Sequence, residues 1–124
     1  MAGYKIDRTA EDIRRELAVL LRELKDPRVQ GKMLTVVNVE VSSDLSFAKV
    51  YVSAMEGLDT AKTAVKGLTA ATGYLRRALG QALRLRKTPE LKFIADNSIE
   101  KGMQITRMMN DLLPAQEGAE PDAD

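Results

Sequence analysis

The chain has no cysteine and no histidine among its 124 residues. The absence of cysteine excludes disulfides, thiolate metal sites and a cysteine nucleophile. The absence of histidine removes the usual general base at neutral pH and the commonest metal ligand. The carboxylates Asp96, Glu100 and Asp111 are the remaining candidates for catalysis, but the first two are better explained by the start of a helix. We therefore expect no cofactor, no metal and no enzymatic activity.

Long apolar runs are also missing. No segment approaches the ~18–20 apolar residues that a membrane span requires. The first residues, "MAGYKIDRTAEDIRREL", contain no apolar stretch typical of a secretory signal. Apolar residues make up 44% and charged residues 30% of the chain, which is ordinary for a globular protein. We expect a single cytoplasmic domain that is monomeric and makes no membrane contact.

Positive and negative charges are segregated along the chain, so the formal net charge of +1 hides a basic domain. The final segment, "PAQEGAEPDAD", carries four acids and no base. Residues 1–113 therefore hold 19 basic residues against 14 acidic ones. A polar, acidic segment of this kind has little to bury. We expect residues 1–113 to form the domain and residues 114–124 to be a disordered acidic tail.

The first quarter of the chain predicts one helix. Thr9 followed by Asp12 resembles a capping box, and apolar residues at helical spacing then continue to Leu24. Pro27 and Gly31 in the following "KDPRVQGK" end the helix.

The next segments alternate with a period of two. In residues 33–41 we expect Val37, Val39 and Val41 on the buried face, with polar residues between them. Residues 47–55 alternate again, and the short polar "SSDLS" separates the two runs. This pattern predicts an antiparallel hairpin.

From Asp59 onward the period is helical again, and its spacing allows one long helix; a break or kink at "ATG" is favoured because glycine is unfavourable inside a helix. A short strand is predicted at residues 88–96, and Asn97 with Glu100 predicts the start of a last helix. We expect that helix to pack through one stripe and its Met108 and Met109 to fill the core; the stripe is Ile99, Met103, Thr106, Met109 and Leu113.

Basic residues concentrate in "RRALGQALRLRKTPELKF", residues 76–93, where a single acid, Glu90, opposes six basic side chains. The apolar stripe of the predicted helix leaves its arginines and Gly80 facing outward. Solvated helix faces ordinarily mix signs, whereas a one-signed face repels itself unless it binds a polyanion. We therefore predict binding of nucleic-acid phosphates, with a merely solvated basic face as the alternative. The candidate residues are Arg76, Arg77, Arg84, Arg86, Lys87 and Lys92.

Aromatic residues are too few to favour base-by-base recognition. Tyr4, Tyr51 and Tyr74 are available to stack on bases, and Phe47 and Phe93 are expected in the core. A protein that recognises phosphates and RNA shape is favoured over a sequence-specific single-strand binder.

The order helix, strand, strand, helix, helix, strand resembles a type II KH domain, an RNA-binding fold. More specifically, "ATGYLRRALGQALRLRKTPELKF", "DNSIEKGMQI" and "LKDPRV" resemble the ribosome-binding factor A family over residues 4–113. The resemblance implies an α+β fold with a three-stranded sheet, helices on one face of it and an additional C-terminal helix. No two glycines of this chain stand three apart, so the Gly-x-x-Gly loop of ordinary KH domains is missing. The family's Ala-x-Gly kink is matched by Ala71, Thr72 and Gly73, which shifts the expected RNA contact toward the basic helix.

The resemblance also implies a function. Members of this family are non-enzymatic factors that bind the immature small (30S) ribosomal subunit and assist late maturation of 16S rRNA, including its 5′ end. A ribosome-associated GTPase would promote release, and the family is linked to growth in the cold. The alternatives are a KH-like RNA-binding protein unconnected with ribosomes and a pure protein-interaction domain.

Overall fold

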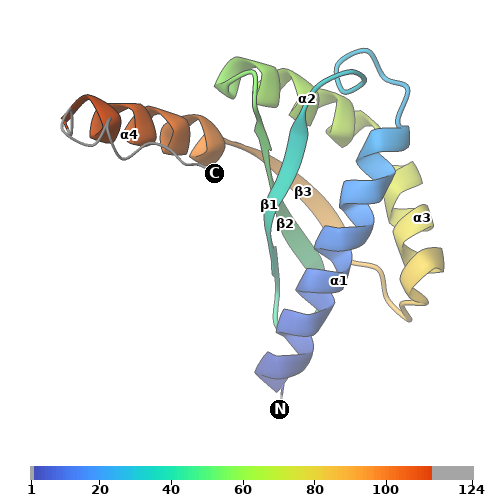
Figure 1. Cartoon of the computed structure of the whole chain (residues 1–124). Helices are drawn as coiled ribbons and strands as arrows, with labels where there is room; N and C mark the ends of the chain where they lie inside the picture. Colours follow the sequence, from blue (N-terminus) through green and yellow to red (C-terminus); the bar gives the residue numbers. More distant parts are fainter. Residues whose placement is uncertain (1, 113–124) are drawn as a thin grey trace.

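The computed structural model describes residues 2–112, with the side chains of residues 6–99 and 101–112. Four helices and three strands follow one another in the predicted order (Figure 1). Their bounds are α1 Ala2–Glu23, β1 Leu34–Val41, β2 Phe47–Ala54, α2 Leu58–Ala70, α3 Thr72–Leu83, β3 Glu90–Asp96 and α4 Ser98–Leu112. Within these residues no helix is long and apolar enough to cross a membrane. The acidic segment 114–124 lies outside the described residues.

The three strands form one mixed sheet in the order β1-β2-β3. β1 and β2 are antiparallel, with Val39 opposite Val50, and β3 runs parallel to β2, with Phe93 opposite Val50. A parallel neighbour requires a crossover connection, and α2 and α3 supply it. The α+β fold with a three-stranded sheet is confirmed.

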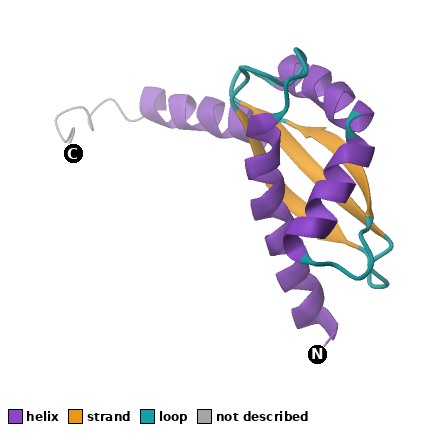
Figure 2. Cartoon of the chain, turned by 90° about the vertical axis from the view of Figure 1, so that its right-hand side faces the viewer, coloured by secondary structure: helices purple, strands orange, loops and turns teal. Residues whose placement is uncertain are grey.

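Three helices share one face of the sheet, as Figure 2 shows. α1 packs against β1, α2 against β2 and β3, and α3 against α1 and β3. The expected buried face of β2 is confirmed, because Ala48, Val50, Val52 and Ala54 are all buried, although Ser53 on the other face is buried as well. The largest fully buried apolar side chains between the layers are Ile13, Leu17, Leu68, Leu75, Leu79, Val50 and Val52.

β1 contains a β-bulge between Val36 and Asn38, and the bulge changes which residues are buried. A bulge inserts one unpaired residue, so the alternation shifts by one position across it. Val36 and Val39 are buried, whereas Val37 and Val41 are only half-buried. Val41 still packs against the core, so the predicted buried face of Val37, Val39 and Val41 is wrong only at Val37.

The turn between β1 and β2 is stabilised by the carboxylate of Asp44. Asp44 accepts hydrogen bonds from the hydroxyls of Ser42 at 2.8 Å and Ser46 at 2.7 Å, and from the Ser46 amide at 3.1 Å. These bonds stabilise the charged form, with the Ser46 hydroxyl contributing most, and lower the pKa of Asp44 to about 2. Phe47, directly after the turn, is 49% exposed, so its predicted burial is wrong.

α1 begins seven residues before the predicted cap at Thr9. Thr9 and Asp12 therefore lie inside the helix, and the capping-box interpretation is wrong. The predicted apolar stripe is confirmed, because Ile13, Leu17, Leu20 and Leu21 are all buried.

The segment after α1 packs closely against α2. Val29 is buried, and a Cβ atom added to Gly67 of α2 would stand 2.9 Å from Val29 Cγ2 and 3.2 Å from Arg28 Cβ. Gly31 then takes a left-handed backbone conformation, φ +80°, and leads into β1. Only glycine at position 67 allows this approach without displacement of the loop.

The expected break between the two central helices is confirmed, and it lies at Ala71. Ala71 has φ −94° and ψ 10°, and it ends α2 and precedes α3. Gly73 belongs to the first turn of α3, has no positive φ, and would place an added Cβ in open space. The break therefore does not depend on a glycine conformation at position 73.

α4 extends away from the other helices (Figure 1). It begins directly after Asn97, as predicted, but every residue described from Lys101 to Leu112 is exposed. Met108 is 62% and Met109 54% exposed, so the prediction that they fill the core is wrong. Met103 and Thr106, two further members of the expected packing stripe, are also exposed. Its last member, Leu113, lies outside the described residues.

Candidate nucleic-acid interface

The outer face of α3 carries the centre of the predicted basic surface. Arg77, Gln81 and Arg84 follow one another at steps of four and three, so they lie on the same side of the helix, and all three are exposed. Buried Leu75 and Leu79 hold the opposite side of the helix in the core. Burial of the apolar stripe therefore leaves the basic side chains on the solvent-exposed face of the helix.

Arg76 has a different position from the one predicted. Its side chain is partly buried, with Nε donating to the Pro89 carbonyl oxygen at 3.1 Å and Nη2 to the Thr88 carbonyl oxygen at 2.8 Å. Arg76 therefore fastens α3 to the chain that enters β3. The expectation that it faces outward is corrected, because the returning chain covers this side of the helix.

The loop from α3 to β3, which begins at Arg84, adds two more cations. Arg84 ends α3 in a left-handed conformation, φ 52°, and the Leu85 amide donates to the Gly80 carbonyl oxygen at 3.1 Å. Arg86 and Lys87 then follow, and both are exposed. We use the term basic surface for Arg77, Arg84, Arg86 and Lys87.

Gly80 allows this loop to lie close to α3. An added Cβ at Gly80 would stand 2.5 Å from Thr88 Oγ1, closer than a Cβ atom approaches a non-bonded neighbour. The neighbour that fills the space beside Gly80 is the side chain of Thr88. The loop cations are thereby held beside the helix.

Lys92 does not belong to the basic surface. Its neighbours Leu91 and Phe93 are buried under the helices, so the alternation of β3 directs Lys92 to the open face of the sheet. There it is paired in register with Lys49, whose other neighbour is Glu40. The Tyr51 hydroxyl donates to Glu40 Oε1 at 3.1 Å, which raises the pKa of Tyr51. This open face mixes both signs of charge.

The sequence marks Tyr74 as available for stacking on a base without grouping it with the basic residues, and in the structure its side chain belongs to the same helix face as the basic surface. It precedes Arg77 by three positions and is 47% exposed. An exposed aromatic ring beside an arginine can stack on an unpaired base. The spacing of three between Tyr74 and Arg77 was the signal available in the sequence.

The interhelical segment Ala71, Thr72 and Gly73 leads directly into this face. The Thr72 hydroxyl donates to the Thr69 carbonyl oxygen at 2.6 Å, which ties the start of α3 to the end of α2. The first turn of α3 contains no acidic residue, and its cap makes no side-chain hydrogen bond. Gly73 is exposed, and the backbone N–H groups at the junction bond to the carbonyl oxygens of Gly67, Leu68 and Thr69 at the end of α2.

The ion pairs shown for residues 2–112 all lie away from the basic surface. Glu11 pairs with Arg14 and Arg15, and Asp26 pairs with Arg28. Hydrogen bonds from Arg14 to Glu11 and from Arg28 to Asp26 lower the pKa of each carboxyl to about 2. The cations of the basic surface make no such pairs within the described part of the chain.

Four cations without carboxylate partners, beside an exposed tyrosine, can hold phosphate groups of a nucleic acid. Among the side chains that the structure describes, no three acidic groups lie so that they could hold a metal ion. The four cations themselves offer the binding of an anionic chain.

The comparisons with known proteins agree on one family. The sequence model of ribosome-binding factor A matches residues 5–109. A ribosome-binding factor A of Acetivibrio thermocellus is 40% identical over 121 residues, which cover 97% of this chain and 98% of that protein. The one of Methylobacillus flagellatus is 48% identical over 119 residues, which cover 95% and 90%.

Solved structures show the same fold. The crystal structure of ribosome-binding factor A from Thermus thermophilus is 32% identical, with a TM-score of 0.63 over 73% of this chain and 93% of that one. A homology model of the Thermus thermophilus factor, fitted into the cryo-EM map of its complex with 30S, is 34% identical, with a TM-score of 0.55 over 67% and 86%. By sequence and by fold, the chain belongs to the ribosome-binding factor A family.

Proposed function

We propose that this protein is a non-enzymatic ribosome assembly factor that binds the immature small ribosomal subunit through its basic surface. The single observation that carries the proposal is the set of four cations on α3 and the following loop, Arg77, Arg84, Arg86 and Lys87, which have no carboxylate partner among the described residues. Family membership supports the choice of ribosomal RNA as the anion. The complex of the Thermus thermophilus factor with 30S supports it further.

The proposed contact is with phosphates more than with base edges. Arginine and lysine neutralise phosphates, and each neutralised phosphate makes the affinity more dependent on salt. Four contacts give a slope of about −3 to −4 in a plot of log affinity against log salt concentration, so affinity falls roughly 100-fold between 50 and 200 mM salt. Tyr74 would add stacking on one unpaired base.

The finer parts of the proposal come from the family resemblance. The factor would assist late maturation and 5′-end processing of 16S rRNA in the cytoplasm, contribute to growth in the cold, act as a monomer and leave with the help of a ribosome-associated GTPase. Residues 1–113 would be the RNA-binding domain, and residues 114–124 an acidic segment outside it.

The test is sedimentation of cell extract on a sucrose gradient, with the protein detected in each fraction. The proposal expects the protein in the fractions of the small subunit, enriched where 16S rRNA still carries its precursor 5′ end. Co-migration with other RNAs, and none with small subunits, would favour the alternative of a KH-like RNA-binding protein unconnected with ribosomes. Retention on small subunits at high salt would contradict the phosphate contacts.

A further inference from the structure

We propose that the groove between α1 and the edge strand β1 is a second RNA site, which takes a phosphate-bearing nucleotide of an unpaired RNA segment. This inference rests on the proposed RNA-binding function, but it concerns residues outside the basic surface. The groove encloses about 360 Å³, within the ~300–1,000 Å³ range that is typical of ligand pockets. We call it the α1–β1 groove.

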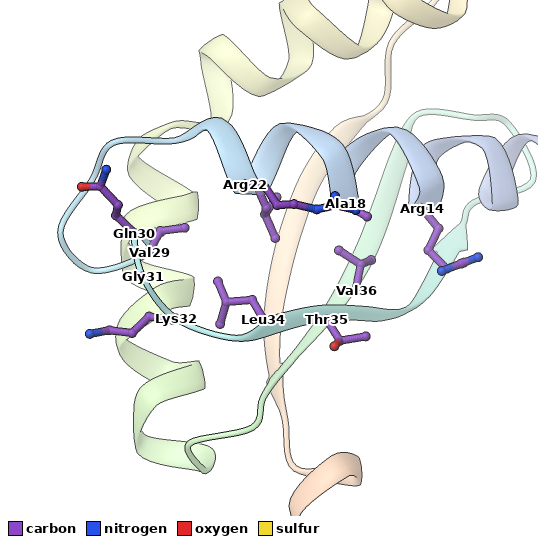
Figure 3. Close-up of a pocket in the computed structure, with 11 residues that line it drawn as sticks. Arg14, Ala18, Arg22, Val29, Gln30, Gly31, Lys32, Leu34, Thr35 and Val36 are labelled. Atoms are coloured by element: carbon purple, nitrogen blue, oxygen red, sulfur yellow. The ribbon is translucent and has the colours of Figure 1, made fainter.

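Figure 3 shows how the groove is built. α1 forms one wall, with Arg14, Ala18 and Arg22 along it, and the start of β1 forms the other, with Leu34 and Val36. The segment Val29–Lys32, held against Gly67 of α2, closes one end. The walls therefore belong to elements that the core keeps in place.

The groove is lined by basic side chains, two of which have no carboxylate partner among the described residues. Three basic side chains line it, those of Arg14, Arg22 and Lys32, and no acidic side chain is among the lining residues. Arg22 and Lys32 are exposed. Neither belongs to the ion pairs shown for residues 2–112. Arg22 on the α1 wall and Lys32 at the closed end of the groove are both available to bind a phosphate.

The side chain of Arg14 is held in one orientation by Glu11. Its Nε donates to Glu11 Oε1 at 2.9 Å and its Nη2 to Glu11 Oε2 at 2.6 Å. A guanidinium fixed in this way presents a flat cation at the edge of the groove, and guanidinium planes stack on nucleic-acid bases. The floor beneath is apolar, from Leu21, Val29 and Val36. Cations at the rim and an apolar floor fit a nucleotide, whose phosphate is charged and whose base is flat.

An extended peptide is the competing ligand, because β1 lies at the edge of the sheet and β2 is its only strand partner among residues 2–112. Peptides add to such edges by extending the sheet. Here the bulge between Val36 and Asn38 interrupts the edge, and only the three residues Leu34, Thr35 and Val36 precede it in the strand. Bulges protect edges from strand addition. The geometry therefore favours a compact anionic ligand over a peptide strand.

The two RNA sites would lie on different sides of α1. This helix packs against β1, where the groove is, and also against α3, which carries the basic surface. A protein with both sites can hold two RNA segments, or two parts of one strand that crosses α1.

The test is a titration of the ¹⁵N-labelled full chain with a short single-stranded oligoribonucleotide, followed by amide chemical shifts. We expect shifts at Gly31, Lys32, Leu34 and Ala18 in addition to those on α3. In the variant R22Q/K32Q the groove shifts should disappear while the α3 shifts remain. The slope of log affinity against log salt should also become about 0.7 less steep, since the variant loses one phosphate contact and each such contact to a single strand contributes roughly 0.7. The matched control K101Q/R107Q, which also removes one lysine and one arginine from exposed positions, should leave the groove shifts unchanged.

The outcomes separate this inference from the proposed function. Shifts confined to α3, or groove shifts that survive R22Q/K32Q, would overturn the groove assignment and leave the basic surface intact. An acidic peptide that shifts the groove amides at lower concentration than the oligoribonucleotide would overturn it in favour of a peptide site. Failure of the wild-type protein to bind small subunits would refute the proposed function, whatever the titration shows.

Discussion

Arg76 and Arg77 are adjacent arginines, and the structure assigns them opposite roles. Arg76 donates to the carbonyl oxygens of Thr88 and Pro89, whereas Arg77 is exposed on the basic surface. We therefore expect R76Q to destabilise the fold and R77Q to leave it unchanged. Glutamine is shorter than arginine and cannot replace both hydrogen bonds, so two carbonyl groups lose their charged donor.

The size of the effect follows from these bonds. A hydrogen bond with a charged partner contributes about 1.5–3 kcal/mol, and because Arg76 is only partly buried we expect a total loss of about 2 kcal/mol for both bonds. Urea denaturation of a small domain has a slope of about 1–3 kcal/mol per M, so the midpoint should fall by about 1 M. R77Q, as an exposed substitution, should change stability by no more than ~0.5 kcal/mol.

The assay is urea denaturation followed by circular dichroism, with wild type, R76Q and R77Q measured side by side. Equal midpoints for the two variants would refute the structural role of Arg76. A loss of stability in R77Q but not in R76Q would refute the assignment of both residues.

Three further predictions follow from burial and charge. Gly67→Ala should destabilise the fold by about 1–3 kcal/mol, because its Cβ would meet Val29 and Arg28, while Gly73→Ala should be neutral or stabilising by up to ~1 kcal/mol; equal urea midpoints for the two alanine variants would contradict the packing described. M108Q/M109Q should leave the thermal midpoint unchanged, since both side chains are exposed; a clear drop would mean that α4 packs onto the domain in solution. Stability should be constant above the ordinary carboxyl pKa near 4 and should decline as pH falls toward 2, because the folded-state pKa is lowered to about 2 for Glu11, Asp26 and Asp44. D44N should show a weaker decline than wild type, and an identical pH profile would remove Asp44 from this account.

The helices and strands whose apolar residues keep one uninterrupted spacing could be predicted from the sequence. β2 alternates without interruption, and the stripe Ile13, Leu17 and Leu20 keeps helical spacing, so both buried faces were predicted correctly. The bulge in β1 could not be predicted, since one inserted residue leaves no signal in a run of valines. The start of α1 was predicted too late because Thr9 and Asp12 have the spacing of a capping box without serving as one.

The errors at the candidate site and in α4 have a different cause. Spacing on a helix shows which side chains share a face, but not which other segment covers that face. Arg76 was expected outward because the return of residues 88–89 over α3 is a tertiary contact. Lys92 was grouped with the arginines because it is near them in sequence, although strand alternation directs it to the open face of the sheet. The stripe of α4 was expected in the core, yet the helix extends away from it.

The central claim is that the basic surface binds small-subunit RNA through phosphates. The most direct test measures how tightly R77Q/R84Q binds purified immature small subunits over a range of salt concentrations. Circular dichroism and a urea midpoint equal to wild type would first establish that the variant is folded. The control K101Q/R107Q also has two fewer positive charges, on exposed positions of α4. The account predicts that R77Q/R84Q binds more weakly at low salt and that its slope of log affinity against log salt is about 1.5 less steep, whereas the control follows wild type. Equal affinity and equal slope for R77Q/R84Q and wild type would contradict the claim.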